Sequence, residues 1–344
     1  MKVFVHGCGL TAMVTAGALA ASGHHVCLRR VEAGGSLVPV DEPGLDALIR
    51  QQVDAGRLLL DEPQGQPEGQ AVHFLAFAPD QHALAEACVD AVAGTSADLL
   101  VVNRTNFGVG ATGTLGDRLR TAREGRGRRT AAACLPDFLR RGTALANFNR
   151  PDRIILGTDE AWAETLLREI LRPFVGYESQ VIVMPSRDAE FTKQVVNGML
   201  ATRLSYMNDM ANVADAIGVD IEHVRRGVGS DERIGGHFLQ PGCGFGGTGF
   251  YQDLLSLKST LDSSGVASKL LDTALTVNDE QKDLLFRKLW KHFRGRLAGR
   301  RIAVWGVAFK PDTDRVDYAP SLRIVESLLA QGAEVVAHDP RALA

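Results

Sequence analysis

Three polar side chains, Lys193, Asn197 and Asp253, are of types that transfer protons and stabilise a developing charge. The chain from Phe191 to Ile217 has no proline and repeats apolar residues at three- and four-residue steps, which predicts one long helix. Lys193 and Asn197 would share a face of it, because they are four residues apart. An ammonium beside a developing alkoxide lowers the cost of that charge, and Asp253 is a candidate base, acting directly or through water. Most Lys/Asn pairs on helices are ordinary surface pairs, so this interpretation depends on further motifs.

A glycine turn near the N-terminus has the pattern of a dinucleotide site. An apolar strand at 3–5 is followed by Gly7-x-Gly9-x-x-Ala12, a helix-like run and a second strand. Gly7 allows a tight turn, Gly9 lets backbone N–H groups approach a pyrophosphate, and Ala12 keeps the helix close to the sheet. The other interpretation is a glycine-rich turn that binds nothing. We expect cofactor contacts from Gly7, Gly9, Leu10, Thr11 and Ala12.

Short apolar strands alternate with helical stretches over the first half of the chain. Further strands are expected at 72–78, 98–103, 130–134 and 152–157. This alternation predicts an α/β fold with a mostly parallel, doubly wound, Rossmann-like sheet.

Composition excludes several classes of protein. The 344 residues include 38 basic and 41 acidic side chains, and a net charge of −3 gives no general attraction to nucleic acid or to an anionic membrane. No apolar run approaches the roughly 20 residues of a membrane span, and the chain begins directly with a strand rather than a signal peptide. The five scattered cysteines favour reduced thiols in the cytoplasm over disulfides or a zinc site, so no metal is expected.

A glycine-rich loop at 242–253 reads GCGFGGTGFYQD. It resembles the active-site loop of the UDP-glucose/GDP-mannose 6-dehydrogenase family, G-x-G-F-G-G-S-C-F-P-K-D. Residues 189–197 resemble the family's A-E-L-x-K-x-x-x-N, and three further matches to family motifs lie at 42–46 (E-P-G-L-D), 231–235 (D-x-R-I-G) and 308–314 (A-F-K-x-x-T-D). These motifs occur in family order and span nearly the whole chain.

The resemblance implies an NAD(P)-dependent oxidoreductase that acts on a CH–OH group of a UDP- or GDP-linked sugar in carbohydrate biosynthesis. It implies catalytic roles for Lys193, Asn197, Asp253, Thr105 and Asp137. It implies that Arg233 reaches the sugar in a neighbouring subunit and that the segment with Phe309 and Lys310 touches the nucleotide. The full set of implied substrate contacts is Phe138, Leu139, Lys193, Asn197, Arg233, Phe238, Gly242, Gly246, Phe250, Phe309 and Lys310.

The chain departs from the family pattern at four functional positions. Gly249 stands at the Cys nucleophile, Gln252 at a Lys, Arg141 at a Glu, and Asp317 at the Arg of T-D-D-x-R. The family oxidises one alcohol twice, and the second oxidation proceeds through a covalent thioester that needs the thiol. We therefore expect one two-electron step, to a ketone or aldehyde. The alternatives are a UDP-glucose 6-dehydrogenase that makes a uronic acid, and an inactive relative that binds cofactor or nucleotide sugar.

The residues expected to contact the cofactor are compatible with either NAD or NADP. NAD enzymes place an acidic residue at the end of the second strand, whereas this chain has Arg30 there. Arg30 could pair with the 2′-phosphate of NADP or stack on adenine, and Glu32 could reach back to the ribose. NAD is the family default. Ala78-Pro79 stands where relatives often have Thr-Pro, so cofactor contacts are also expected from Ala78, Pro79 and Thr105.

We expect three domains. Residues 1–185 would bind NAD(P), residues 186–297 would form a helical domain with the active site, and residues 298–344 would begin a nucleotide-sugar-binding Rossmann-like domain, truncated after its second strand. The resemblance implies a homodimer through the long helix. An intramolecular core helix is the other interpretation.

Overall fold

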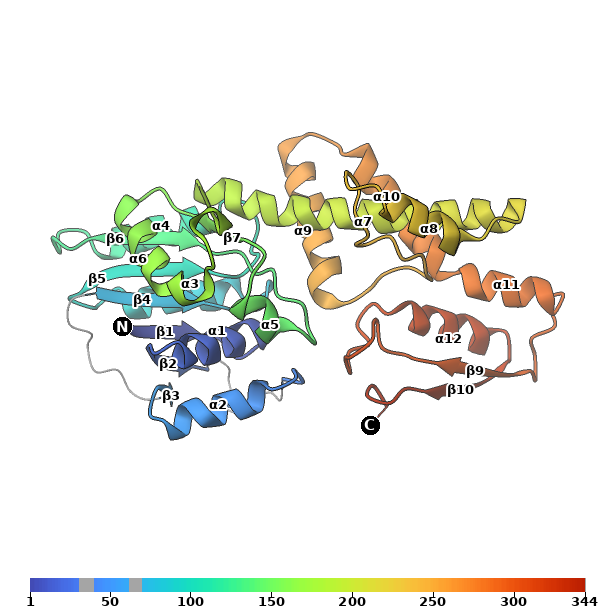
Figure 1. The fold of residues 1–344 in the computed structure, drawn as a ribbon, viewed down its shortest axis with the longest axis horizontal. Helices are drawn as coiled ribbons and strands as arrows, with labels where there is room; N and C mark the ends of the chain where they lie inside the picture. Colours follow the sequence, from blue (N-terminus) through green and yellow to red (C-terminus); the bar gives the residue numbers. More distant parts are fainter. Residues whose placement is uncertain (31–39, 62–69, 344) are drawn as a thin grey trace. The chain divides into compact units, whose positions relative to one another are not determined.

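The computed structural model describes residues 1–30, 40–61 and 70–343 (Figure 1). The chain forms two compact units, Met1–Lys193 and Gln194–Ala344, and each is described by itself. The division into three domains at 185/186 and 297/298 stays a prediction.

The first unit is built on one sheet, in which eight strands are seen among the described residues. Their order is β3-β2-β1-β4-β5-β6-β7-β8. The strands are β1 (Lys2–His6), β2 (His25–Arg29), β3 (Leu58–Leu60), β4 (Gln70–Leu75), β5 (Asp98–Asn103), β6 (Thr130–Cys134), β7 (Ile154–Gly157) and β8 (Val181–Met184). The first six run parallel, and β7 joins β6 antiparallel. The strand order reverses between β1 and β4, which is where such sheets bind nucleotides.

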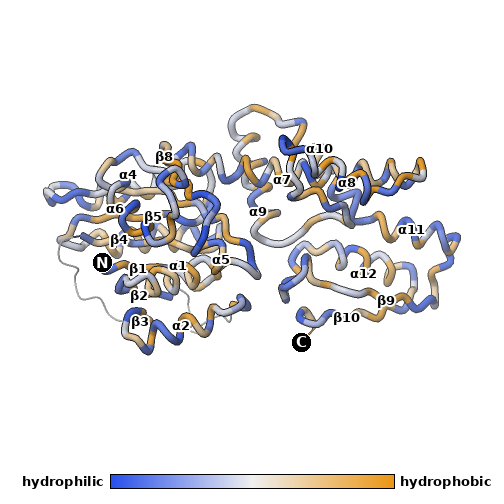
Figure 2. The backbone as a smooth tube through the Cα atoms, in the orientation of Figure 1, coloured by the Kyte–Doolittle hydropathy of each residue, from blue (hydrophilic) through white to orange (hydrophobic). Residues whose placement is uncertain are grey.

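Helices cover both faces of this sheet. They are α1 (Leu10–Ala21), α2 (Leu45–Asp54), α3 (His82–Val92), α4 (Ala111–Ala122), α5 (Ala144–Asn149) and α6 (Ala161–Leu171), with short 3₁₀ turns η1 (Arg172–Phe174) and η2 (Glu178–Gln180). Alternate residues of one strand pack on opposite sides: Leu100 lies in the core with α1, α2, α5 and α6, and Leu99 in the core with α3 and α4. The strands are mainly hydrophobic (Figure 2). The predicted doubly wound, mostly parallel α/β fold is confirmed.

The long helix is α7 (Ser186–Ile217), five residues longer at its start than the periodicity predicts. The second unit contains most of α7 and the elements α8 (Ile221–Gly229), α9 (Thr248–Ser264), α10 (Lys269–Lys282), α11 (Leu284–His292), β9 (Arg301–Trp305), α12 (Pro320–Ala330) and β10 (Glu334–His338). One apolar cluster joins α7, α9 and α10. A second joins α11 and α12 to the parallel β9–β10 pair, which gives that small sheet the cover it needs. Of the helices that the structure describes, none has the length and apolar character to cross a bilayer.

Candidate active site

The glycine turn after β1 has the backbone geometry of a phosphate cradle. Gly7 has φ +132°, and a Cβ there would lie 2.1 Å from the carbonyl oxygen of Ala76. At Gly9 a Cβ would meet nothing within 4 Å, so the approach to the turn is open. The helix α1 starts at Leu10 with no acidic residue in its first turn and no capping side chain from the described residues. Its N–H groups and positive partial charge therefore suit a pyrophosphate.

The carboxyl ends of β4 and β5 are tied together beside this turn. The N–H of Phe77 donates to Oγ1 of Thr105 (3.0 Å), and that hydroxyl is within 3.3 Å of the carbonyl oxygen of Phe77. The side chain of Asn103 accepts from the N–H of Thr105 (3.0 Å). β4 ends at Leu75, and the exposed Ala78 and Pro79 follow it. Thr105, Ala78 and Pro79 thus share one edge of the sheet.

The loop after β6 brings Asp137 to the same turn. The hydroxyl of Thr11, in the first turn of α1, donates to Asp137, which also accepts from the N–H of Leu139 (2.7 Å). The next ring, Phe138, lies under the ammonium of Lys193 at 4.9 Å. Buried Glu42 accepts from the N–H groups of Gly142 (2.7 Å) and Ala144 (2.6 Å), and so fixes the end of this loop from the E-P-G-L-D segment.

Through Glu42 the E-P-G-L-D segment at 42–46 supports the loop after β6, although the segment itself does not line the glycine turn. Its carboxylate stands at the N-terminus of α5, where the helix leaves backbone donors unsatisfied and favours negative charge. Arg141, the departure from the family pattern that lies in this loop, is half-buried.

The second unit contains a buried amide–carboxylate pair. Nδ2 of Asn197 donates to Oδ2 of Asp253 at 2.5 Å, and each residue is only 7% exposed. Asn197 comes from α7 and Asp253 from the first turns of α9, so a bond between two helices orients both side chains. The structure thus brings together two of the predicted site residues, the amide of Asn197 and the candidate base Asp253, within this unit. Lys193 is the last residue of the first unit, four residues before Asn197 in α7.

The glycine-rich loop before α9 packs against the segment after β9. A Cβ at Gly246 would lie 2.2 Å from the carbonyl oxygen of Tyr318, and a Cβ at Gly247, where φ is +89°, would lie 2.6 Å from the ring of Phe309. The N–H of Gly247 donates to the carbonyl oxygen of Asp317 (2.8 Å). Only glycine permits this approach of two backbones. Two stretches predicted to bind substrate are thus in direct contact.

Gly249 is different from its neighbours in the loop. It is exposed in the first turn of α9, and a Cβ there would meet nothing within 4 Å. Space for a side chain exists, but the residue supplies none. Cys243, six positions earlier, is half-buried, and burial raises the pKa of its thiol. A thiol that resists ionisation is a poor substitute nucleophile.

The remaining predicted substrate residues also lie in the second unit. The ring of Phe250 packs against Phe245 (5.2 Å between centroids) and Phe238 (6.2 Å). The N–H of Gly242 donates to the side chain of Asn208 (2.8 Å). The guanidinium of Arg233 is exposed and paired with Asp231 (2.6 Å). Lys310 lies over the ring of Phe309 at 5.7 Å.

The three parts of the chain match the three domains of one family. Residues 1–175 match the NAD binding domain, residues 187–280 the central domain and residues 303–344 the UDP binding domain of the UDP-glucose/GDP-mannose dehydrogenase family. The chain belongs to this family.

Individual relatives agree. A UDP-glucose 6-dehydrogenase of Pseudomonas aeruginosa is 39% identical over 368 residues, covering 99% of this chain and 79% of the relative. The UDP-glucose 6-dehydrogenase YwqF of Bacillus subtilis is 33% identical and covers all of this chain and 80% of the relative. A solved UDP-glucose dehydrogenase of the archaeon Pyrobaculum islandicum superposes with a TM-score of 0.90 at 29% identity, over 99% of this chain and 82% of that one. The predictions of family, oxidoreductase class and NAD as cofactor are confirmed.

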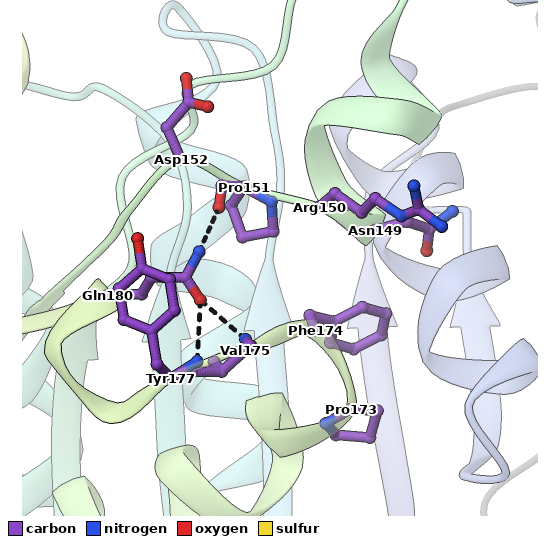
Figure 3. A pocket seen from close by; sticks show the side chains of 10 residues that line it. Asn149, Arg150, Pro151, Asp152, Pro173, Phe174, Val175, Tyr177 and Gln180 are labelled. Carbon is purple, nitrogen blue, oxygen red and sulfur yellow. Dashed lines mark hydrogen bonds between the residues drawn. The ribbon is translucent and has the colours of Figure 1, made fainter.

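One cavity of about 660 Å³ lies in the first unit of this family member, and none of the predicted site residues lines it. It is lined by Asn149–Asp152, Pro173–Tyr177 and Gln180. Gln180 connects the segments that line it (Figure 3). The side-chain amide of Gln180 donates to the carbonyl oxygen of Pro151 (3.0 Å). Its oxygen accepts from the N–H groups of Gly176 (2.7 Å) and Tyr177 (3.3 Å). These contacts stabilise a loop and suggest no chemistry.

Two further arginines near the family's motifs were not predicted from the sequence. Arg104 directly precedes Thr105, is 5% exposed and lies over the ring of Phe148 at 5.3 Å. Burial lowers the pKa of its guanidinium, and the charge of Asp137 partly offsets this. A charged residue directly after an apolar strand was the available signal.

The second arginine is Arg315. The family's T-D-D-x-R has Asp at this position and Arg two residues later, and here the two charges are exchanged. Nε of Arg315 donates to Oδ2 of Asp317 at 2.6 Å. The guanidinium missing at 317 is therefore present in the same segment, and reading both departures together would have found it.

Proposed function

We propose that this chain is a nucleotide-sugar dehydrogenase that oxidises a sugar alcohol in a single two-electron step, to a ketone or aldehyde. One observation carries the proposal. The buried Asn197–Asp253 pair is complete, whereas Gly249 in the adjoining turn of α9 bears no nucleophile. The chain has the groups for the first oxidation and lacks the thiol for the second.

Each side chain has a role in the balanced reaction. The alcohol carbon loses a hydride and its hydroxyl loses a proton, which leaves a carbonyl. NAD⁺, when bound, accepts the hydride. Asp253 accepts the proton directly or through water, and Asn197 orients that carboxylate. The ammonium of Lys193 stabilises the alkoxide. Thr105 and Asp137 position the cofactor, through their bonds to Phe77 and Thr11.

Each of the three predicted domains has its own role in binding the cofactor or the sugar. Residues 1–185 hold NAD, with phosphates on the turn from Gly7 to Ala12. Residues 186–297 supply the catalytic pair, and residues 298–344 contribute Phe309 and Lys310 to a UDP- or GDP-linked sugar. The match to a UDP binding domain supports UDP. None of the five cysteines, all of which the structure describes, is in a disulfide, and this supports a reducing, cytoplasmic setting.

The second candidate is oxidation to a uronic acid, which the relatives' names favour, since they are called UDP-glucose 6-dehydrogenases. That reaction removes four electrons and passes through a thioester on a Cys. Burial raises the pKa of the Cys243 thiol, which disfavours the thiolate that this step needs. A single oxidation therefore accounts better for these residues.

A homodimer through α7 is part of the proposal. Within the second unit an apolar stripe of exposed residues runs along this helix: Val195, Met199, Tyr206, Val213 and Ile217. Met199 is 62% and Tyr206 59% exposed, and contiguous apolar faces of this kind mark subunit contacts. Met199→Glu with Tyr206→Glu should yield a monomer in light scattering, and Ser259→Glu on the exposed face of α9 should not. Equal masses for the wild type, the double variant and the control would exclude α7 as the subunit contact.

The deciding experiment counts reduced cofactor per sugar consumed, with purified protein, NAD⁺ and a panel of UDP- and GDP-sugars. One equivalent supports the single oxidation. Two equivalents, with acid as product, would replace it by the uronic acid reaction. Turnover of none of the sugars, with NAD⁺ bound, would favour a binding-only relative.

A further inference from the structure

The end of β2 carries an ion pair in place of the expected acidic residue. Arg30 follows β2 and Asp61 follows β3, 31 positions later. The N–H of Arg30 donates to Oδ1 of Asp61 at 2.8 Å, and the guanidinium donates to Oδ2 of the same carboxylate. One carboxylate thus holds both the backbone and the side chain of Arg30.

Asp61 is built into this position. Its N–H donates to the carbonyl oxygen of Leu28 (3.0 Å), so it extends the pairing of β3 with β2. Its φ is +53°, a left-handed conformation that costs energy for most side chains. Burial disfavours the ionised carboxyl, but the hydrogen bonds from Arg30 outweigh burial and hold the pKa of Asp61 below its ordinary value. The carboxylate is therefore charged at neutral pH.

The pair lies at the adenosine end of the dinucleotide site. The N–H of Gly7 donates to the carbonyl oxygen of Arg29 (2.9 Å), so the phosphate turn and the end of β2 are adjacent. In folds of this class the acidic residue about 20 positions after the glycine turn accepts from the adenosine ribose hydroxyls. Arg30 occupies that position in the chain, and Asp61 brings a carboxylate to it from the neighbouring strand.

We propose that Asp61 is the carboxylate that accepts the ribose hydroxyls of NAD⁺, that Arg30 holds it in place, and that the pair selects NAD⁺ over NADP⁺. A carboxylate has about four acceptor sites, and Arg30 leaves some of them for hydroxyl donors. A 2′-phosphate would meet the negative charge of Asp61, and the guanidinium that could compensate is already engaged. The contrary role for Arg30, direct binding of the 2′-phosphate, predicts the opposite preference. The earlier alternative, Glu32, lies outside the described residues.

Isothermal titration with NAD⁺ and with NADP⁺ separates these roles without any sugar substrate. We expect the wild-type protein to bind NAD⁺ at least about tenfold more tightly than NADP⁺, since one charge-assisted bond is gained and one repulsion avoided. Asp61→Asn and Asp61→Gly should each narrow that ratio about tenfold or reverse it, because they free Arg30 for the phosphate. Asparagine and glycine both tolerate a positive φ, so both variants at position 61 should fold.

Two further variants complete the test. Arg30→Ala should weaken the binding of NADP⁺ at least as much as the binding of NAD⁺. The carboxylate of Asp61 would then repel the 2′-phosphate with no guanidinium beside it. Asp90→Ala is the matched control: it removes a carboxylate that pairs with Arg118 at 2.6 Å on α3 and α4, and both affinities should stay unchanged. A wild-type preference for NADP⁺ that is lost in Arg30→Ala would overturn the proposal, as would an unchanged ratio in both Asp61 variants. The inference goes beyond the proposed single oxidation and does not depend on it, because binding is measured without hydride transfer.

Discussion

Replacing Gly246 by alanine should disrupt the contact between the glycine-rich loop and the segment after β9. The added Cβ would lie 2.2 Å from the carbonyl oxygen of Tyr318, whereas ordinary contacts begin at 3.4 Å. The two backbones must therefore separate by about 1.2 Å, the difference between these distances. Overpacking costs about 1–3 kcal/mol. Because the contacted atom is backbone and cannot rotate away, we expect about 2–3 kcal/mol of lost stability.

Gly249→Ala is the matched control in the same loop. Its Cβ would meet nothing within 4 Å, and the position is helical. Replacing glycine by alanine in a helix stabilises by up to about 1 kcal/mol, so the two variants should differ by about 3 kcal/mol in free energy of unfolding. Urea unfolding followed by circular dichroism measures this difference.

The displacement should also impair catalysis. A shift of about 1 Å in a positioning group can cost about a hundredfold in rate, so kcat/KM for the nucleotide sugar should fall accordingly in Gly246→Ala and stay near wild type in Gly249→Ala. The affinity for NAD⁺ should be unaffected in both. Equal urea midpoints for the two variants would refute the close approach of Gly246 to Tyr318.

Three further predictions concern the catalytic pair, the missing thiol and acid stability. Asp253→Asn should lower kcat about 10²- to 10⁴-fold without changing the Kd of NAD⁺, and full activity in that variant would exclude Asp253 as the base. Gly249→Cys should leave one reduced cofactor per sugar if the substrate is a secondary alcohol, whereas acid product in that variant would reveal a primary alcohol. Burial, and then the charge of Arg29, lower the pKa of His6 to about 3, and burial holds that of its partner His73 well below 6.5. The unfolded chain therefore binds protons first as the pH falls below about 6.5, so stability should drop by up to about 1.4 kcal/mol per pH unit for each histidine; urea unfolding at pH 7.5 and 5.5 checks this. His73→Gln should flatten the dependence and the exposed His25→Gln should not, and equal wild-type stabilities at both pH values would contradict the buried, neutral pair.

Local patterns in the sequence were sufficient for several elements of this protein, although not for the short strands β3 and β8. The glycine turn, the alternating strands and the helix that carries Lys193 and Asn197 were all predicted, because a residue's neighbours along the chain set its backbone preferences and its periodicity. The family motifs also determined the candidate residues and the absent thiol at Gly249. These features need no knowledge of which strands are adjacent.

Only the tertiary structure decided which distant residues meet. Asp61 reaches Arg30 because β3 pairs with β2, and Gly246 must be glycine because Tyr318, 72 positions later, lies against it. The burial of Arg104 and the bond between Asn197 and Asp253 likewise depend on packing between separate elements. Such contacts follow from strand order and helix packing, which arise from the whole hydrophobic core rather than from any one segment. The sequence therefore determined the chemistry available to this protein, and the fold determined which of its charges act together.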